Sequence, residues 1–313
     1  MTQTIQIICN LRSGAGQSTH ILQEVQSLLQ EFQIPSQTHI TQYRTHAVTL
    51  AKNIVQTNPY DTTQPVIVIG GDGTLHEVVS GLYATQVLRP IIYVPAGTGN
   101  DFHRTWQANK STRDIVRHVL GESEPTNIPI FLHTDHTTGV TDILLNNMGF
   151  GLDAEINIEA KRLQKTPFFA NKLTYKLSYT AAIWHSLKKL RPVNLTISVD
   201  GQEPFSINQV PLACVMNTPF LGGGIRLDNL VEPKKQEISL IAFHDITFTA
   251  LIDLIRRVFI TRNQHLSSHV KRYTGKELRL QLSAPIRSHV DGEDLGMVQS
   301  DISYRLSHYP FYL

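Results

Sequence analysis

The stretch Val66-Ile67-Val68-Ile69-Gly70-Gly71-Asp72-Gly73-Thr74 decides the fold of this chain. Its β-branched apolar residues predict a buried strand, and the amphipathic run Leu75–Leu82 behind the glycines predicts a helix. Glycines let the backbone approach a ligand, and the start of a helix presents N–H groups and the positive end of the helix dipole. This strand–turn–helix unit therefore predicts an anion-binding turn in an α/β fold.

A second glycine turn, Pro95-Ala96-Gly97-Thr98-Gly99-Asn100-Asp101-Phe102, follows the apolar run Pro90–Val94. Open α/β sheets bind ligands at the carboxyl ends of their strands, and both turns stand at such an end. The two turns together predict a single ligand cleft.

The order of predicted strands and helices changes near Glu124. Before this residue, strands and helices alternate, which predicts a parallel sheet covered by helices. The other elements predicted there are strands at Ile5–Cys9 and Thr38–Thr41 and helices at Thr19–Phe32, His46–Gln56 and Ser111–Leu120. After it, short β-type runs predict a β-sandwich-like domain interrupted by two helices. The strands are Asn127–His133, Thr141–Met148, Asn194–Val199, Glu203–Asn208, Leu212–Met216, Ile238–Phe243, Leu278–Leu282, Ser288–Val290 and Ser300–Ser307, and the helices are Phe168–Leu190 and Thr247–Ile260.

Composition restricts the class of protein. With 313 residues, 41% of them hydrophobic, the chain is long enough for two domains. A formal net charge of +2 disfavours nucleic acid as the main partner. Cys9 and Cys214 lie in apolar runs and are expected to be buried thiols in a reducing compartment. The N-terminus lacks a signal-peptide pattern and no apolar stretch reaches about 18 residues, so we expect a cytoplasmic protein.

The sequences of the two turns, GGDGTLHEVVSGL and PAGTGNDF, resemble those of the bacterial diacylglycerol kinase and lipid kinase family, whose catalytic domain is shared with sphingosine and ceramide kinases. Ile5–Gly14 looks like the family's first strand and its Asn-Pro-x-Ser-Gly loop, with Leu11 in place of proline. Val290-Asp291-Gly292-Glu293 looks like its Asp-Gly-Glu catalytic segment. The resemblance implies an α/β fold with a three-layer nucleotide-binding domain of the NAD kinase and phosphofructokinase type over residues 1–124. It also implies that residues 303–313 return to that domain and that residues 125–302 form a β-sandwich-like lipid-binding domain.

The resemblance implies ATP and Mg²⁺ as cofactors and places the nucleotide on the loops of the first domain. The residues that match the family's nucleotide contacts are Asn10, Leu11, Arg12, Ser13, Gly14, Thr41, Gly71, Asp72, Gly73, Thr74, Leu75, His76, Glu77 and Thr98. For Thr41 the alternative is an ordinary strand-end hydroxyl. For Glu77 it is a carboxylate at the start of a helix, which is electrostatically favourable whatever the function.

Three carboxylates are the predicted catalytic groups, because phosphoryl transfer needs a proton acceptor and a metal ion that neutralises the phosphate charge, and a carboxylate can be the acceptor or bind the ion. By resemblance, Glu293 is the general base; the alternative is a solvated residue beside a hairpin turn at Asp291-Gly292. Asp72 is predicted to bind the ATP-associated Mg²⁺ or to act as a base, since it follows two glycines and is not readily hidden in an apolar core. Asp101 either belongs to the site, as in the family, or caps the following helix.

One segment departs from the family. Gly222–Leu240 aligns without gaps with a stretch whose acidic pair contributes to a structural magnesium site in some bacterial members, but here the matching positions hold Lys234-Lys235-Gln236. Ammonium groups repel a cation and cannot ligate it. We therefore expect no structural magnesium at residues 234–236, with lysine charge in place of the ion.

The expected function is an ATP-dependent lipid kinase that converts diacylglycerol to phosphatidic acid at the inner face of the membrane, as a peripheral protein whose homodimerisation is left open. The alternatives are a kinase for another lipid such as sphingosine, a NAD kinase-like enzyme that shares the first turn, and a catalytically degenerate nucleotide- or lipid-binding regulator. The candidates for membrane contact are the basic and aromatic segment Lys161–Arg191 and the helix that contains Arg256-Arg257, each with core packing as the alternative.

Overall fold

The computed structural model describes residues 4–57, 63–120, 124–164, 166, 181–182, 185–186, 191–299 and 301–313. The chain folds into two compact units, Met1–Ile130 with Ser307–Leu313, and Phe131–Leu306. Two strands continue from one unit into the other, β5 (Thr126–Asp135) and β18 (Asp301–Tyr312). The chain therefore leaves the first unit along β5 and re-enters it along β18.

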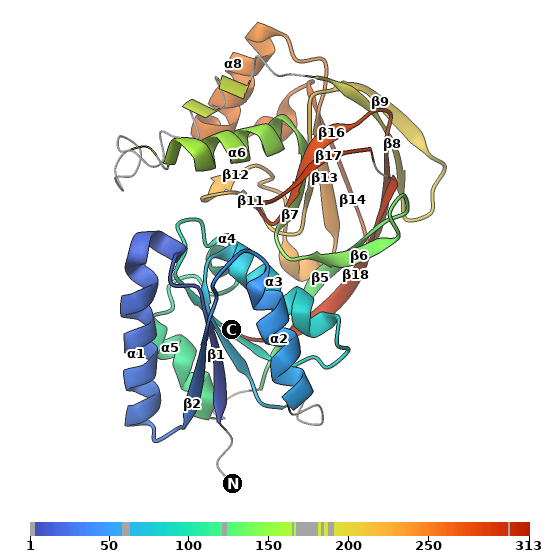
Figure 1. The fold of residues 1–313 in the computed structure, drawn as a ribbon. Helices are drawn as coiled ribbons and strands as arrows, with labels where there is room; N and C mark the ends of the chain where they lie inside the picture. Colours follow the sequence, from blue (N-terminus) through green and yellow to red (C-terminus); the bar gives the residue numbers. More distant parts are fainter. Residues whose placement is uncertain are drawn as a thin grey trace. The chain divides into compact units, whose positions relative to one another are not determined.

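The first unit is a parallel sheet with helices on both faces (Figure 1). The strands lie in the order β2, β1, β3, β4, and the end of β18 pairs in parallel with β4. The strands are β1 (Ile5–Cys9), β2 (Ser36–Ile40), β3 (Val66–Gly70) and β4 (Ile91–Pro95). The helices are α1 (Gln17–Glu31), α2 (His46–Thr57), α3 (Asp72–Tyr83), α4 (Asp101–Trp106) and α5 (Thr112–Val116), with the 3-10 turns η1 (Ser13–Gly16) and η2 (Arg117–Leu120).

Apolar periodicity explains how these layers pack. One side of α1 is apolar at helical spacing and forms a buried cluster with α5 and with alternate residues of the strands. On the opposite face of the sheet, α3 lies so close to α2 that a Cβ at Gly81 would be 2.7 Å from the Val48 carbonyl oxygen. Because helices cover both faces, β3 is buried along its whole length. The helical residues of the cluster between α1, α5 and the sheet are Leu22, Val25, Leu28, Leu29, Ile115 and Val116. The predicted three-layer α/β architecture is confirmed.

The second unit is built from two packed antiparallel sheets. The first sheet has the order β14, β13, β10, β7, β16, β17, and the second includes β18, β15, β8 and β9 in that order, with β5 and β6 beside β18. The strands are β6 (Val140–Leu144), β7 (Asn147–Gly151), β8 (Val193–Val199), β9 (Phe205–Val210), β10 (Leu212–Met216), β11 (Phe220–Leu221), β12 (Ile225–Arg226), β13 (Ile238–Phe243), β14 (Val270–Gly275), β15 (Glu277–Leu282), β16 (Ile286–Val290) and β17 (Glu293–Val298). The helical elements are α6 (Leu152–Gln164), α8 (Phe248–Arg256), the π-helical turn η5 (Arg257–Thr261) and the 3-10 turns η4 (Pro233–Lys235) and η6 (Gln264–Leu266).

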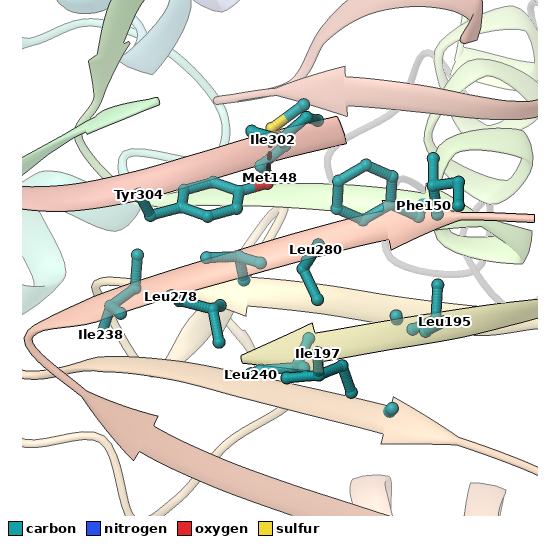
Figure 2. Close-up of a cluster of buried hydrophobic side chains, with 14 of the residues drawn as sticks. Met148, Phe150, Leu195, Ile197, Ile238, Leu240, Leu278, Leu280, Ile302 and Tyr304 are labelled. Carbon is teal, nitrogen blue, oxygen red and sulfur yellow. Dashed lines mark hydrogen bonds between the residues drawn. The ribbon is translucent and has the colours of Figure 1, made fainter. Parts of the chain in front are cut away.

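Inward-facing side chains of the two sheets meet in one buried cluster (Figure 2). Met148 and Phe150 come from β7, whereas Leu195 and Ile197 come from β8 in the other sheet. The hydroxyl of Tyr304 on β18 donates to the sulfur of Met148 at 3.2 Å, so one hydrogen bond crosses between the sheets. Alternate burial along β8 and β15 follows the two-residue period of a strand with one buried face. The predicted β-sandwich-like architecture is confirmed.

Several predicted elements differ from those observed. The strand predicted over Thr141–Met148 is two strands, β6 and β7. They are separate because the carboxylate of Asp291 accepts hydrogen bonds from the backbone N–H groups of residues 145–147. The helix predicted over Ser111–Leu120 ends as the 3-10 turn η2, and the one over Thr247–Ile260 ends as the π-helical turn η5. The strands β14 and β17 and the helix α6 were not predicted.

The helix predicted over Phe168–Leu190 lies outside the described residues, apart from two short helical pieces at 181–182 and 185–186. None of the helices in the described part of the chain is both long and apolar enough to cross a membrane.

Candidate active site

Three loops of the first unit, which follow β1, β3 and β4, touch one another. Asn10, at the end of β1, donates from Nδ2 to the hydroxyl of Thr74 in the first turn of α3 at 3.1 Å. A Cβ at Gly14 would lie 2.2 Å from the carbonyl oxygen of Ala96, and the φ of Gly14 is +60°. A backbone this close leaves no room for a side chain, so packing between loops already requires glycine here.

The two glycine turns predicted to hold an anion meet backbone to backbone. A Cβ at Gly97 would lie 2.6 Å from the Cα of Gly71, whereas a Cβ at Gly71 would lie 3.4 Å from the Cα of Gly97. Gly71 is the N-cap of α3, so the N–H groups of the first turn of that helix have no acceptor within the helix. Backbone donors at the start of a helix are a group of the kind that binds phosphate.

Asp72 connects the two turns. Its carboxylate oxygens accept hydrogen bonds from the backbone N–H groups of Asp101 and Phe102, both at 3.0 Å. It therefore caps α4 from another loop, a role that its position after two glycines did not predict. Asp101, the second predicted acid of this group, is buried and lies 3.7 Å from the Arg104 guanidinium. Asp72 and Asp101 thus share one corner of the loop cluster.

Two residues that the sequence analysis did not single out shape the second turn. Asn100 adopts a φ of +53°, and its side chain accepts from the Gly97 N–H at 3.0 Å and donates to the Gly97 carbonyl at 2.8 Å. The hydroxyl of Tyr93 donates to the Gly70 carbonyl at 3.2 Å. Burial raises the pKa of Tyr93, and the charges of Asp72 and Asp101 raise it further, so the hydroxyl stays a donor. The signal available in the sequence was asparagine beside a glycine turn, since asparagine tolerates the left-handed conformation.

The other predicted nucleotide residues fall into two groups. Thr98 and Arg12 are exposed on their loops, and Leu11, Ser13 and Gly73 are partly buried. In contrast, the side chains of Leu75 and His76 are buried.

Glu77 is also engaged within the protein. Its carboxylate accepts from the backbone N–H groups of Thr45 at 2.9 Å and Ala47 at 3.2 Å. It therefore fixes the start of α2 to α3. Thr41 is the residue that follows β2. Its backbone N–H donates to the Cys9 carbonyl at 2.9 Å, so the loop after β2 is bonded to the end of β1.

In the second unit, Asp291-Gly292 forms a two-residue turn between β16 and β17. Both residues have positive φ, +47° and +83°, as the turn that suits a twisted hairpin requires. The Asp291 carboxylate accepts from the backbone N–H groups of Leu145, Asn146 and Asn147 at 2.7–3.0 Å. These bonds separate β6 from β7. Glu293 is the first residue of β17, pairs with Val290 and is partly exposed.

A buried polar chain supports this turn. His289 on β16 and Asp153 on α6 are both almost completely buried, with Nε2 and Oδ2 2.6 Å apart. The other ring nitrogen of His289 accepts from the N–H of Gly292 at 3.3 Å, so Nε2 carries the proton that is donated to Asp153. The Cys214 thiol also donates to Asp153, at 3.3 Å, and a Cβ at Gly149 would lie 1.6 Å from the same carboxylate. The turn before Glu293 is thereby bonded to His289, and Asp153 on α6 connects His289 to β7 and β10.

An apolar cavity of about 110 Å³ lies in the second unit. Its wall is almost entirely hydrocarbon, with Asp153 as its charged member. A dry cavity of comparable size, about 150 Å³, is known to take up benzene, so this one has room for part of an acyl chain. The lining residues are Leu152, Asp153, Ile156, Pro211, Leu212, Leu221, Gly222, Ile225, Leu227, Phe243, Ile246, Leu251, Leu254, Ile255, Val258 and Phe259.

The segment predicted to lack structural magnesium forms the turn η4. Lys235 pairs with Glu232 at 2.9 Å on the surface. Nearby in the chain, the buried carboxylate of Asp228 accepts from the Ser239 hydroxyl at 2.6 Å and from the Arg272 guanidinium at 2.7 Å. In the part of the chain that the structure describes, no three His, Cys, Asp or Glu side chains are grouped as a metal site. The absence of structural magnesium stays a prediction.

The family of this chain is shown by two family models that match consecutive parts of it. The diacylglycerol kinase catalytic domain matches residues 4–129, and the YegS C-terminal NAD kinase beta sandwich-like domain matches residues 146–306. The chain therefore belongs to the lipid kinase family that these two domains define, as the sequences of its glycine turns predicted.

Relatives agree with this assignment. "Putative lipid kinase YtlR" of Bacillus subtilis is 26% identical over 292 residues, which cover 92% of this chain and 93% of that protein. "Putative lipid kinase SERP0390" of Staphylococcus epidermidis is 26% identical over 77% of this chain and 74% of its own length. A solved structure described as "a putative diacylglycerol kinase" from Bacillus anthracis has a TM-score of 0.72 at 18% identity and covers 98% of this chain and 96% of its own, which shows a shared fold.

Proposed function

We propose that this protein is an ATP-dependent lipid kinase whose acceptor is diacylglycerol. The observation that carries the choice of a lipid acceptor is the cavity of the second unit, whose wall is almost entirely apolar. A hydrocarbon wall stabilises a buried acyl chain by about 0.8 kcal/mol for each methylene group removed from water. A polar acceptor such as a free nucleotide would gain nothing from it.

For the nucleotide, the support comes from the loops of the first unit. The first turn of α3, which begins after Gly71, offers backbone N–H donors, and Gly97 packs beside it without a side chain of its own, which suits the phosphates of ATP. Asp72 is the carboxylate at these loops that would hold a nucleotide-bound Mg²⁺, and Asp101 lies in the same corner of the loops. When bound, Mg²⁺ supplies neutralisation of the phosphate charge. The residues present therefore fit the cofactors of the proposed reaction.

Glu293 is proposed as the general base. Its carboxylate would take the proton of the lipid hydroxyl as the hydroxyl oxygen attacks the terminal phosphorus of ATP, with ADP leaving. The rigid turn before it is the support for this role, because a base must be positioned as well as available.

The test is incubation of the purified chain with labelled ATP and a panel of acceptors in mixed micelles: diacylglycerol, monoacylglycerol, sphingosine, ceramide and NAD. We expect label in phosphatidic acid. A cavity-filling variant, Val258→Phe, should raise the KM for long-chain diacylglycerol more than that for a short-chain one and leave the KM for ATP unchanged. Val140→Phe, at an exposed site on β6, is the matched control.

Three outcomes would contradict the proposal. Label in NAD alone would make the chain a NAD kinase-like enzyme. Label in sphingosine or ceramide but not in diacylglycerol would show that the acceptor is a different lipid, while the protein would still be a lipid kinase. ATP binding without transfer to any acceptor would favour a regulator that has lost catalysis.

A further inference from the structure

The outer side of α8 and of the turns that follow it exposes large apolar side chains. Exposed fractions are 66% for Phe248, 49% for Ile252, 43% for Phe259, 74% for Ile260 and 68% for Leu266. Phe248 and Ile252 are four residues apart on one face of α8, and Phe259 and Ile260 lie on η5, which continues it. Isolated exposed apolar residues are ordinary, but a continuous patch of them marks a surface that contacts another apolar phase. We call these five residues the α8 patch.

The charge around the α8 patch is positive. Residues 247–266 contain three arginines and one aspartate, a net charge of 3 − 1 = +2 with histidine neutral. Arg256 and Arg257 both pair with Asp253, so two cations share one carboxylate. Arg262 is exposed at the end of η5. Apolar side chains flanked by arginine are the composition of helices that lie in the interface of an anionic membrane.

The inner side of the same helix lines the apolar cavity. Leu251, Leu254, Ile255 and Val258 belong to the cavity wall, and Phe259 belongs both to that wall and to the α8 patch. Hydrocarbon surface therefore continues from the outside of α8 into the cavity. A lipid drawn from a bilayer beneath α8 would not have to cross a polar rim along this path.

We propose that α8 and η5 insert the α8 patch into the surface of an anionic lipid leaflet and so place the mouth of the cavity at the membrane. The inference rests on the proposed function in one respect, that the acceptor is a membrane lipid. A second copy of the chain fits less well, because a two-fold contact brings the same patch against itself and would oppose net positive charge with net positive charge.

Sedimentation of the full chain with sucrose-loaded vesicles tests this, without nucleotide. The vesicles contain phosphatidylglycerol and phosphatidylcholine in equal parts, or phosphatidylcholine alone. We expect Ile252→Ser and Ile260→Ser each to weaken binding to the anionic vesicles about tenfold, and Arg262→Gln about fivefold. Val140→Ser and Arg305→Gln replace an exposed apolar and an exposed cationic residue of the same unit elsewhere, and should leave binding unchanged.

Urea unfolding of each variant confirms that its fold is retained. Unchanged vesicle binding in folded Ile252→Ser and Ile260→Ser variants would overturn the proposal. So would a concentration-dependent dimer of the wild type that these variants dissociate, because the patch would then belong to a second copy. Vesicle binding that depends on the patch, in a protein that transfers no phosphate to any lipid, would overturn the kinase function and leave the docking surface standing.

Discussion

Asp291 and Glu293 stand two residues apart in one hairpin, and we propose different tasks for them. The carboxylate of Asp291 is buried and bound to three backbone N–H groups, so its contribution is to the fold of the turn. Glu293 is partly exposed at the start of β17. A partly exposed carboxylate is the better candidate for proton transfer, because a substrate hydroxyl can reach it.

Glu293→Gln should lower kcat by about 10²–10⁴-fold, because it keeps the size of the side chain and removes its basicity. The affinity for ATP should not change, since the proposed nucleotide loops lie in the first unit. Asp294→Asn is the matched control: it alters the next carboxylate, which forms a partly buried pair with Arg287 at 2.8 Å, and should cost little activity because Asn keeps the size and an acceptor oxygen. Near-normal kcat for Glu293→Gln on a lipid that the wild type phosphorylates would move the role of base to Asp72 or Asp101.

Asp72 combines a structural and a proposed chemical role, and two substitutions separate them. Asp72→Ala should abolish turnover and also lower the free energy of unfolding by about 1 kcal/mol, because α4 loses its cap. Ser111→Ala removes the cap of α5, where Ser111 and Asp114 form a capping box, and should cost a similar stability with turnover intact. Urea unfolding and steady-state kinetics on both variants give the comparison. Full activity in a folded Asp72→Ala protein would remove Asp72 from the mechanism.

At the scale of elements, the loops after β1, β3 and β4 behave as one packed cluster. Asn10 is bonded to Thr74, Asp72 caps α4, and Gly97 lies against Gly71. In the second unit, β7, α6 and β16 are joined in the same manner through Gly149, Asp153 and His289. Both candidate sites are therefore built where elements meet, and their precision depends on small residues that permit the approach.

Gly71→Ala and Gly97→Ala should differ in what they damage. Gly97→Ala places a methyl group 2.6 Å from backbone and should cost about 1–3 kcal/mol of stability. Gly71→Ala meets backbone at 3.4 Å, an ordinary contact, so the fold should remain while turnover falls, because the new methyl group occupies the proposed path of the phosphates. Thermal unfolding together with ATP affinity checks this. Equal loss of stability in the two variants would show that the steric asymmetry is wrong.

The whole molecule carries one buried thiol in each unit. Burial raises the pKa of Cys9 from its ordinary 9.0 to about 11. Burial also raises the pKa of Cys214, and the charge of Asp153 and its hydrogen bond add to the effect. Folding therefore holds both thiols protonated. β5 and β18 run through both units, which favours unfolding of the two units together.

We expect neither thiol to react with iodoacetamide in the folded protein, and both to become reactive over the same range of urea concentration. The free energy of unfolding should depend on pH, because the pKa of Cys9 is higher in the folded protein than in the unfolded chain. The stability that this shift contributes is fully present below the unfolded pKa of 9.0 and is lost as pH rises towards the folded pKa of about 11. Mass spectrometry of the alkylated peptides along a urea titration measures each thiol separately. Labelling of Cys9 at a lower urea concentration than Cys214 would show that the first unit opens independently.

The sequence by itself was sufficient for the two-part architecture, both glycine turns and the family. These features are local: a strand of β-branched residues, a helix period and a glycine at a turn are visible in consecutive residues. The Asp-Gly pair in the hairpin was visible for the same reason, and the hairpin is there. Boundaries were less accurate where a local pattern ended through a distant contact, as between β6 and β7.

Tertiary structure alone decided what the individual carboxylates do. Asp291 binds backbone groups 144–146 residues away, Glu77 binds the start of α2 30–32 residues before it, and Asp153 meets His289 across 136 residues. No spacing within the sequence encodes such pairings, because they arise when separate elements pack. The apolar cavity and the α8 patch have the same origin. Whether an apolar residue of α8 faces the core, the cavity or solvent depends on what packs beside the helix, and hydrophobicity along the chain does not contain that information.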